Sequence, residues 1–217
     1  MLPKRVADFA KLPLSRKLQF LYFLFFRGFT NLFYRSRLCS CGSNSIVIKP
    51  LFWTPECISI GSRVLIWNGC RIEGIDNHQG NKFQPSIEFG DGVSLQERCH
   101  IVAAGRLIID EQTTISYDVM ITDVDHDYRK IGVNVMSQEL LYLPTYIGKS
   151  CFIGAGARIL AGTELGDHCV VGANSVVRGK FPAGSVIGGI PARALKMYHP
   201  EDSTWKPIEE RAGNIRK

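Results

Sequence analysis

Apolar residues recur at every sixth position through the C-terminal half of the chain. Six consecutive blocks open on an aliphatic residue: Ile147, Ile153, Ile159, Leu165, Val171 and Val177. Four places further on, five of these blocks carry a small or modest-sized residue: Cys151, Ala157, Thr163, Cys169 and Ser175. A period of six fits neither the α-helix, with about 3.6 residues per turn, nor the longer helix-pair repeats. It predicts short strands joined by tight turns.

The same period, in a looser form, extends back towards residue 58. The aliphatic position is held by Ile60, Ile66, Ile72, Phe89, Leu95, Ile101, Ile109, Ile115 and Ile121. The small position is held by Val64, Cys70, Val93, Cys99, Thr113 and Val119. We expect three blocks to complete one triangular coil, in which both positions face inward and stack on their equivalents in the next coil. The sequence therefore predicts an all-β fold, a parallel β-helix, over residues 41–190.

Two stretches interrupt the period, at residues 73–86 and 127–146. The core of a prism needs neither of them, and loops of such length in a compact domain are usually functional. Each follows a third consecutive block, so we expect both to leave the same corner of the coil. After Gly189 the period ends, and residues 191–217 are predicted to form a polar C-terminal tail.

Basic residues are concentrated near the N-terminus. Of the net charge of +6, residues 1–37 contribute +7, eight Lys and Arg against the single acid Asp8, so the remainder sums to −1. Nucleic-acid-binding proteins more often carry their basic residues on the folded body, so no nucleic-acid partner is expected. The apolar run at residues 20–26 is far shorter than the roughly 20 residues that span a bilayer. It also lacks the small cleavage-site residues of a signal peptide.

Residues 1–40 are therefore predicted to form a basic, apolar segment with a short helix. A helix of this composition can lie in the membrane interface, which would give residues 1–37 a peripheral membrane contact. It can equally pack its aromatic side chains on the main domain or across a subunit interface. The sequence leaves both alternatives open.

Seven cysteines are present, an odd number, and no pair has zinc-finger spacing. Four of them occupy the small position of the repeat, where a free cysteine behaves as a small apolar core residue: Cys70, Cys99, Cys151 and Cys169. This usage indicates a reducing compartment. We expect a cytoplasmic protein without a metal site, located at the inner face of the membrane if residues 1–37 bind there.

Three motifs resemble one known family. They are I-T-D-V-D-H at 121–126, V-G-A-N-S-V-V at 171–177 and G-G-I-P-A-R-A-L-K at 188–196. They resemble the hexapeptide-repeat acetyltransferases, most of all the polysaccharide and sugar O-acetyltransferases, and the likeness covers about residues 58–190. It implies a left-handed β-helix, acetyl-CoA as acetyl donor without any required metal, and a homotrimer. It also implies a sugar or glycan hydroxyl as acceptor, in surface polysaccharide or lipid-linked glycan biosynthesis.

The resemblance gives His126 the role of general base. A sugar hydroxyl must lose its proton as it attacks a thioester, and histidine titrates in the pH range that suits this task. Asp123 and Asp125 flank His126 and are candidates to orient its ring or to contact the acceptor. His100 also ends a block and is a further candidate, although a surface turn is its alternative. His78, in the first insertion, could touch an acceptor.

The resemblance also implies where CoA binds. In the family the cofactor lies along the C-terminal coils, where small residues accommodate its pantetheine arm and basic residues meet its phosphates. The positions that match are Ala155 and Ala173 for the arm, with Arg178, Arg193 and Lys196 for the charges. For Lys196 and Arg193 a generic solvated tail is the alternative.

Three other functions compete with this reading. An N-acetyltransferase acting on an amino sugar would use the same fold and donor. A zinc carbonic anhydrase of the same fold needs three histidines, two of them close together in one coil, and His126 has no histidine five residues away. A non-catalytic β-helix scaffold would need no histidine opening a long loop.

Overall fold

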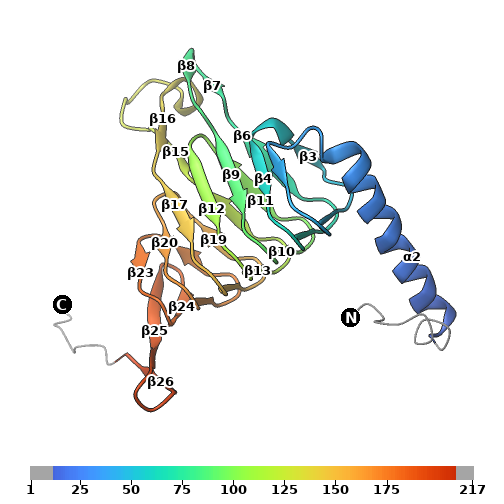
Figure 1. Cartoon of the computed structure of the whole chain (residues 1–217). Coiled ribbons are helices and arrows are strands. Elements are labelled where there is room, and N and C mark those ends of the chain that lie inside the picture. Colours follow the sequence, from blue (N-terminus) through green and yellow to red (C-terminus); the bar gives the residue numbers. More distant parts are fainter. Residues whose placement is uncertain (1–11, 209–217) are drawn as a thin grey trace.

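The computed structural model describes residues 12–208, and its parallel strands wind around a triangular prism with three sheets (Figure 1). The seven-stranded sheet contains β1 (Ser40–Cys41), β4 (Ile58–Ile60), β9 (Ser86–Phe89), β12 (Arg106–Ile109), β17 (Thr145–Ile147), β20 (Glu164–Leu165) and β23 (Lys180–Phe181). The six-stranded sheet contains β3 (Phe52–Trp53), β6 (Arg71–Gly74), β11 (His100–Ala103), β14 (Met120–Thr122), β19 (Arg158–Ile159) and β22 (Val176–Val177).

The nine-stranded sheet begins with seven parallel strands: β2 (Ile46–Val47), β5 (Leu65–Ile66), β10 (Ser94–Leu95), β13 (Thr114–Ile115), β18 (Phe152–Ile153), β21 (Val170–Val171) and β24 (Ser185–Gly189). Two antiparallel strands, β25 (Ala192–His199) and β26 (Thr204–Pro207), complete it. The sequence predicted a polar C-terminal tail over residues 191–217, and residues 192–207 of this range form the hairpin. This segment lacks the six-residue period because it pairs as a hairpin along the sheet instead of continuing the coil.

The core of the prism is formed by the two repeat positions. The aliphatic residues predicted to point inward are buried, among them Ile153, Leu165 and Val177 at 0% exposure. The four cysteines at the small position are at most 2% exposed, which confirms their role as core residues. The hydroxyl residues at this position bond to the backbone; Thr113 Oγ1, for example, donates to the carbonyl of Gly148 at 2.8 Å. Their polar atoms are therefore satisfied inside the core.

Both insertions leave the six-stranded sheet. The first contains the hairpin of β7 (Asn77–His78) and β8 (Asn81–Lys82), and it follows β6. The second follows β14 and begins three residues earlier than predicted, because β15 (Val124–His126) already leaves the coil and pairs with β16 (Leu140–Tyr142). A 3-10 turn at Val135–Ser137 lies between these two strands. Only β11 separates β6 from β14, so the insertions rise together from one edge of the prism (Figure 1).

The N-terminal helix α2 (Leu14–Phe29) continues into a π-helical turn, Thr30–Tyr34. A 3-10 turn also precedes β4, at Pro55–Cys57. The helix packs on the prism through Phe26, which is 6% exposed, and Phe23, whose ring lies edge-on to Trp67 with centroids 5.4 Å apart. Thr30 is buried, and its Oγ1 accepts a hydrogen bond from the N–H of Val47 at 2.9 Å.

The opposite face of α2 is exposed and apolar, formed by Leu14, Leu18, Leu21 and Phe25. Of the two alternatives for this segment, packing on the main domain is therefore present within residues 12–40. No helix in the described part of the chain is both long and apolar enough to cross a bilayer. The peripheral membrane contact stays a prediction, and the basic residues at positions 1–11 lie outside the described residues.

Candidate active site

His126 ends the short strand β15, where it faces Leu140 of β16 across the antiparallel pair. Its side chain is half-buried. Nδ1 is buried and has no hydrogen-bond partner among the described residues. Nε2 also makes no described hydrogen bond, but it is not buried. Nε2 is therefore the ring atom open to solvent and to a reactant.

Asp123 anchors the strand that carries His126. Its carboxylate is fully buried and accepts hydrogen bonds from the N–H of Ala104 at 2.8 Å and the N–H of Gly105 at 3.0 Å. Burial raises the pKa of the Asp123 carboxyl. These bonds tie the start of the second insertion to the preceding coil. Asp123 therefore fixes the position of β15 and makes no described hydrogen bond to the His126 ring.

Asp125 pairs with a residue that is distant in the sequence. Arg178, which follows β22, donates from Nη2 to Asp125 Oδ2 at 2.6 Å, and this guanidinium lowers the pKa of Asp125. The other oxygen of Asp125 accepts the backbone N–H of His126 at 3.0 Å. The structure thus brings Arg178, expected from the resemblance to meet CoA, to the strand of the candidate base.

His78 approaches His126 from the first insertion. Their ring centroids are 6.0 Å apart with an interplanar angle of 68°. His78 Nε2 lies 3.0 Å from the carbonyl oxygen of Gln138, and Gln79 Nε2 donates to the carbonyl of Met136 at 3.0 Å. The two insertions therefore form one wall, in which a second imidazole stands beside the candidate base.

Gln138 organises the second insertion, a role that the sequence does not predict. Its side chain is buried, accepts from the N–H of Lys130 at 3.0 Å, and donates to the carbonyls of Lys130 and Val133 at 3.2 and 3.1 Å. A buried glutamine with three backbone bonds holds the turns of residues 130–138 together. No periodic or motif signal marks this residue in the sequence.

His100 lies apart from this wall. It begins β11, whereas the backbone N–H groups that hold Asp123 lie beyond the other end of that strand. Its side chain is exposed, and partial burial together with the neighbouring Arg71 and Arg158 lowers its pKa. The structure does not bring His100 to His126.

The residues expected to bind CoA fall into two groups. Ala155 and Ala173 follow β18 and β21, neighbouring strands of the nine-stranded sheet, so they stack at one corner of the prism. Arg193 of β25 pairs with Gly188 at the next level of this corner, and Lys196 pairs with Val186 further along. Arg178 instead follows β22 of the six-stranded sheet, whereas Ala155 and Ala173 precede the strands of that sheet, so Arg178 lies at another corner of the prism, beside Asp125. Both basic residues of β25 are exposed.

Side chains that could ligate a metal ion are dispersed over residues 12–208. No cluster of three or more His, Cys, Asp or Glu side chains that could hold a metal ion occurs among them. His78 and His126 are the two histidines that the fold brings together, and the others in this range lie on separate elements.

Comparisons with known proteins agree with this architecture. Residues 144–179 match the model for the bacterial transferase hexapeptide (six repeats). The chain is 35% identical to the protein named "Putative lipopolysaccharide biosynthesis O-acetyl transferase WbbJ" of Escherichia coli K12, over 55% of this chain and 65% of that protein. The chain thus spans just under two thirds of the length of this relative.

Two solved structures share the fold at 18% sequence identity. One is AntD, an N-acyltransferase from Bacillus cereus in complex with dTDP and 3-hydroxybutyryl-CoA, with a TM-score of 0.61 over 77% of this chain and 87% of that one. The other is a galactoside acetyltransferase in complex with coenzyme A, with a TM-score of 0.52 over 94% and 84%. The predicted left-handed parallel β-helix is confirmed. Residues 144–179 therefore carry hexapeptide repeats of the bacterial transferase type, within a left-handed parallel β-helix.

Proposed function

We propose that this chain is a CoA-dependent acetyltransferase that transfers the acetyl group of acetyl-CoA to a sugar hydroxyl, with His126 as general base. One observation carries the proposal. His126 is held half-buried in a wall built from both insertions, with Nε2 left open to a reactant. The likeness to WbbJ and to the fold of CoA-bound acyltransferases supports the choice of donor.

The reaction follows from this geometry. As the acceptor oxygen attacks the thioester carbonyl, its proton passes to Nε2 of His126, and a tetrahedral intermediate forms. When this intermediate collapses, the C–S bond breaks, and the same proton returns from His126 to the departing thiolate of CoA. General-base catalysis of this kind contributes about 10²- to 10⁴-fold in rate. Asp123 acts indirectly, because it positions the strand that carries the base.

CoA is proposed to lie along the C-terminal coils. Ala155 and Ala173 leave room for the pantetheine arm at their corner, and Arg193 and Lys196 offer positive charge to the phosphates there. Arginine suits this task because its planar guanidinium can form two parallel hydrogen bonds to a phosphate. Arg178 is already paired with Asp125, so its role in this proposal is to hold β15 near the reacting end of CoA.

The substitution His126→Ala tests the base directly. We expect transfer activity to fall by about two to four orders of magnitude while CoA affinity and folding are retained. His100→Ala is the matched control, because it removes an exposed histidine of the same β-helix away from the wall, and it should stay within about threefold of wild type. Near-normal turnover of the His126 variant would exclude His126 as base.

An amino sugar is the second candidate acceptor, favoured by the fold likeness to the N-acyltransferase AntD. A panel of hydroxyl and amino sugars, assayed with acetyl-CoA, separates the two reactions. An O-acetyl ester is cleaved by alkaline hydroxylamine, whereas an N-acetyl amide is stable to it. A hydroxylamine-resistant product would mean that the reaction is N-acetylation and not O-acetylation, and the role of His126 would then still have to be tested.

The assembly and location belong to the same proposal. A homotrimer would close three identical interfaces around one axis, so no interface is left unfilled. A monomer in light scattering at micromolar concentration would contradict it. We further propose that residues 1–37 hold a cytoplasmic enzyme at the inner face of the membrane, where a lipid-linked glycan or a surface polysaccharide precursor would be presented.

A further inference from the structure

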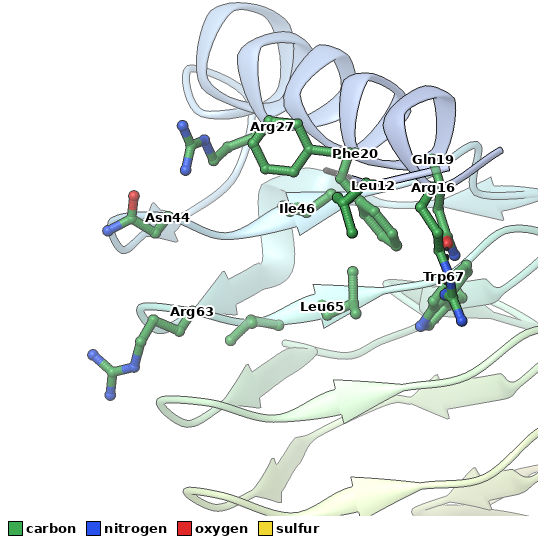
Figure 2. A pocket seen from close by; sticks show the side chains of 12 residues that line it. Leu12, Arg16, Gln19, Phe20, Arg27, Asn44, Ile46, Arg63, Leu65 and Trp67 are labelled. Carbon is green, nitrogen blue, oxygen red and sulfur yellow. Dashed lines mark hydrogen bonds between the residues drawn. The ribbon is translucent and has the colours of Figure 1, made fainter. Parts of the chain in front are cut away.

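A cavity of about 750 Å³ lies between α2 and the first two strands of the nine-stranded sheet, β2 and β5 (Figure 2). Its volume falls within the range of small-molecule sites, about 300–1,000 Å³. It is remote from His126, because β2 and β5 belong to the first coils and β15 follows a later one. The proposed acetyl transfer makes no use of it.

The middle of the cavity is apolar. Side chains from the helix meet side chains of the two strands there, and they belong to Phe20, Phe23, Ile46 and Leu65, with Leu12 just before the helix. Figure 2 shows that the side chains of Leu12, Phe20, Ile46 and Leu65 occupy the space between the helix and the strands. A hydrocarbon chain matches such a lining, because burial of apolar surface drives its transfer from water.

The two ends of the cavity are basic. Arg27 and Arg63 stand with Asn44 at one end, and Arg16 lies beside Trp67 at the other (Figure 2). No Asp or Glu lines the cavity among the described residues. An anionic ligand is therefore the charge-complementary partner.

The arginines differ in how far they are already paired. The Arg27 guanidinium makes no described ion pair or hydrogen bond, whereas that of Arg63 lies 3.6 Å from Asp91 in an exposed ion pair. Arg16 donates to Gln19 Oε1 at 3.1 Å. Arg27 thus offers a free guanidinium, the group best suited to a phosphate.

Trp67 adds an unsatisfied donor to the wall. Its Nε1 is buried and has no acceptor among the described residues. A buried donor without a partner destabilises the structure that holds it.

We propose that this cavity binds one phosphate-bearing lipid of the bilayer, with its hydrocarbon chain in the apolar middle and its phosphate at Arg27 and Arg63. The bilayer is the favoured source because the same helix turns an exposed apolar stripe away from the prism. Leu14, Leu18 and Phe25 of this stripe are 71%, 57% and 63% exposed. The inference deepens the proposed membrane contact and does not depend on acetyl transfer.

Titration calorimetry tests the cavity: n-decyl phosphate, kept below its critical micelle concentration, is titrated into the whole chain. We expect saturable binding with one site per chain, and Arg27→Gln should weaken it by about tenfold or more.

Arg35→Gln is the matched control, since it removes an exposed arginine of the same segment that does not line the cavity. Inorganic phosphate, which lacks the chain, and n-decyl maltoside, which lacks the charge, should bind much more weakly.

Equal affinities of the Arg27→Gln and Arg35→Gln proteins for decyl phosphate would overturn the site, as would binding of decyl maltoside as tight as that of decyl phosphate.

Sedimentation with phosphatidylglycerol vesicles tests whether the bilayer is the source of the ligand. We expect a loss on Arg27→Gln that exceeds the loss on Arg35→Gln, and vesicle binding that is indifferent to Arg27 would overturn the bilayer as source. A second variant, Arg63→Gln, should weaken decyl phosphate binding in the same direction. No acetyl donor is present, so these outcomes are separate from any failure of the transferase proposal.

Discussion

Removal of the Asp123 carboxylate should destabilise the protein more than any other single aspartate change near the candidate site. In Asp123→Ala, the N–H groups of Ala104 and Gly105 lose their only described acceptors. A buried donor left unbonded costs about 1–3 kcal/mol, so two of them cost about 2–6 kcal/mol. Burial raises the pKa of Asp123, so loss of this buried charge offsets part of that cost, and we expect a net loss of about 2–4 kcal/mol.

Chemical denaturation followed by circular dichroism, at one fixed protein concentration, measures this change. In thermal melts the same loss corresponds to a fall in Tm of about 4–16 °C. Asp123→Asn keeps one acceptor oxygen and should lie between Asp123→Ala and wild type. Asp76→Ala, at an exposed aspartate of the first insertion, is the control and should change stability by less than about 0.5 kcal/mol. A free energy of unfolding for Asp123→Ala within that same margin would refute the anchoring role.

Three further substitutions address the wall around His126. Arg178→Gln should raise the pKa of Asp125 towards its ordinary value, as measured by carboxyl NMR titration. Because Arg178 lowers this pKa, the Arg178–Asp125 pair stabilises the fold at pH values above the ordinary pKa of aspartate. Its small contribution is lost as the pH falls through the lowered pKa, so wild type and Arg178→Gln should have the same Tm in acid. Gly105→Ala should cost about 0.5–1.5 kcal/mol in chemical denaturation, since a Cβ there would displace the exposed Tyr142 ring, and its hydroxyl would lose the hydrogen bond from the N–H of Arg106 at 3.2 Å. His78→Ala should change the KM for the acceptor more than the KM for acetyl-CoA, and equal changes in steady-state kinetics would remove His78 from the acceptor side.

The repeat made the β-helix predictable because each core position is specified locally. Cys169 and Val171, for example, are identified as core residues by their spacing alone, and both are buried. The period also located His126 at the start of an interruption, and the structure places it on the wall formed by the two insertions. Periodicity indicates which residues face inward, so it predicts structure within the coil and not in the insertions outside it.

The contacts around His126 could not be predicted in the same way. The pairing of Arg178 with Asp125 and the approach of His78 to Gln138 each join segments more than 50 residues apart. Such contacts depend on how irregular loops fold over one another, which no local spacing encodes. The strand at 192–199 was missed for a related reason, because its partner is the edge of a sheet that exists only after the last coil has formed.

The hydrogen bond from Val47 to Thr30 has a consequence for assembly. A stack of parallel coils resembles a one-dimensional crystal, whose exposed ends could in principle template further growth. At the first coil, Thr30 occupies the outward-facing N–H of Val47, and α2 lies over β2. At the other end, the hairpin of β25 and β26 replaces a parallel edge with one that carries Lys206 and Pro207, a charge and a residue without a donor. Both edges of the nine-stranded sheet are thus closed to a further parallel strand, which disfavours end-to-end growth through this sheet.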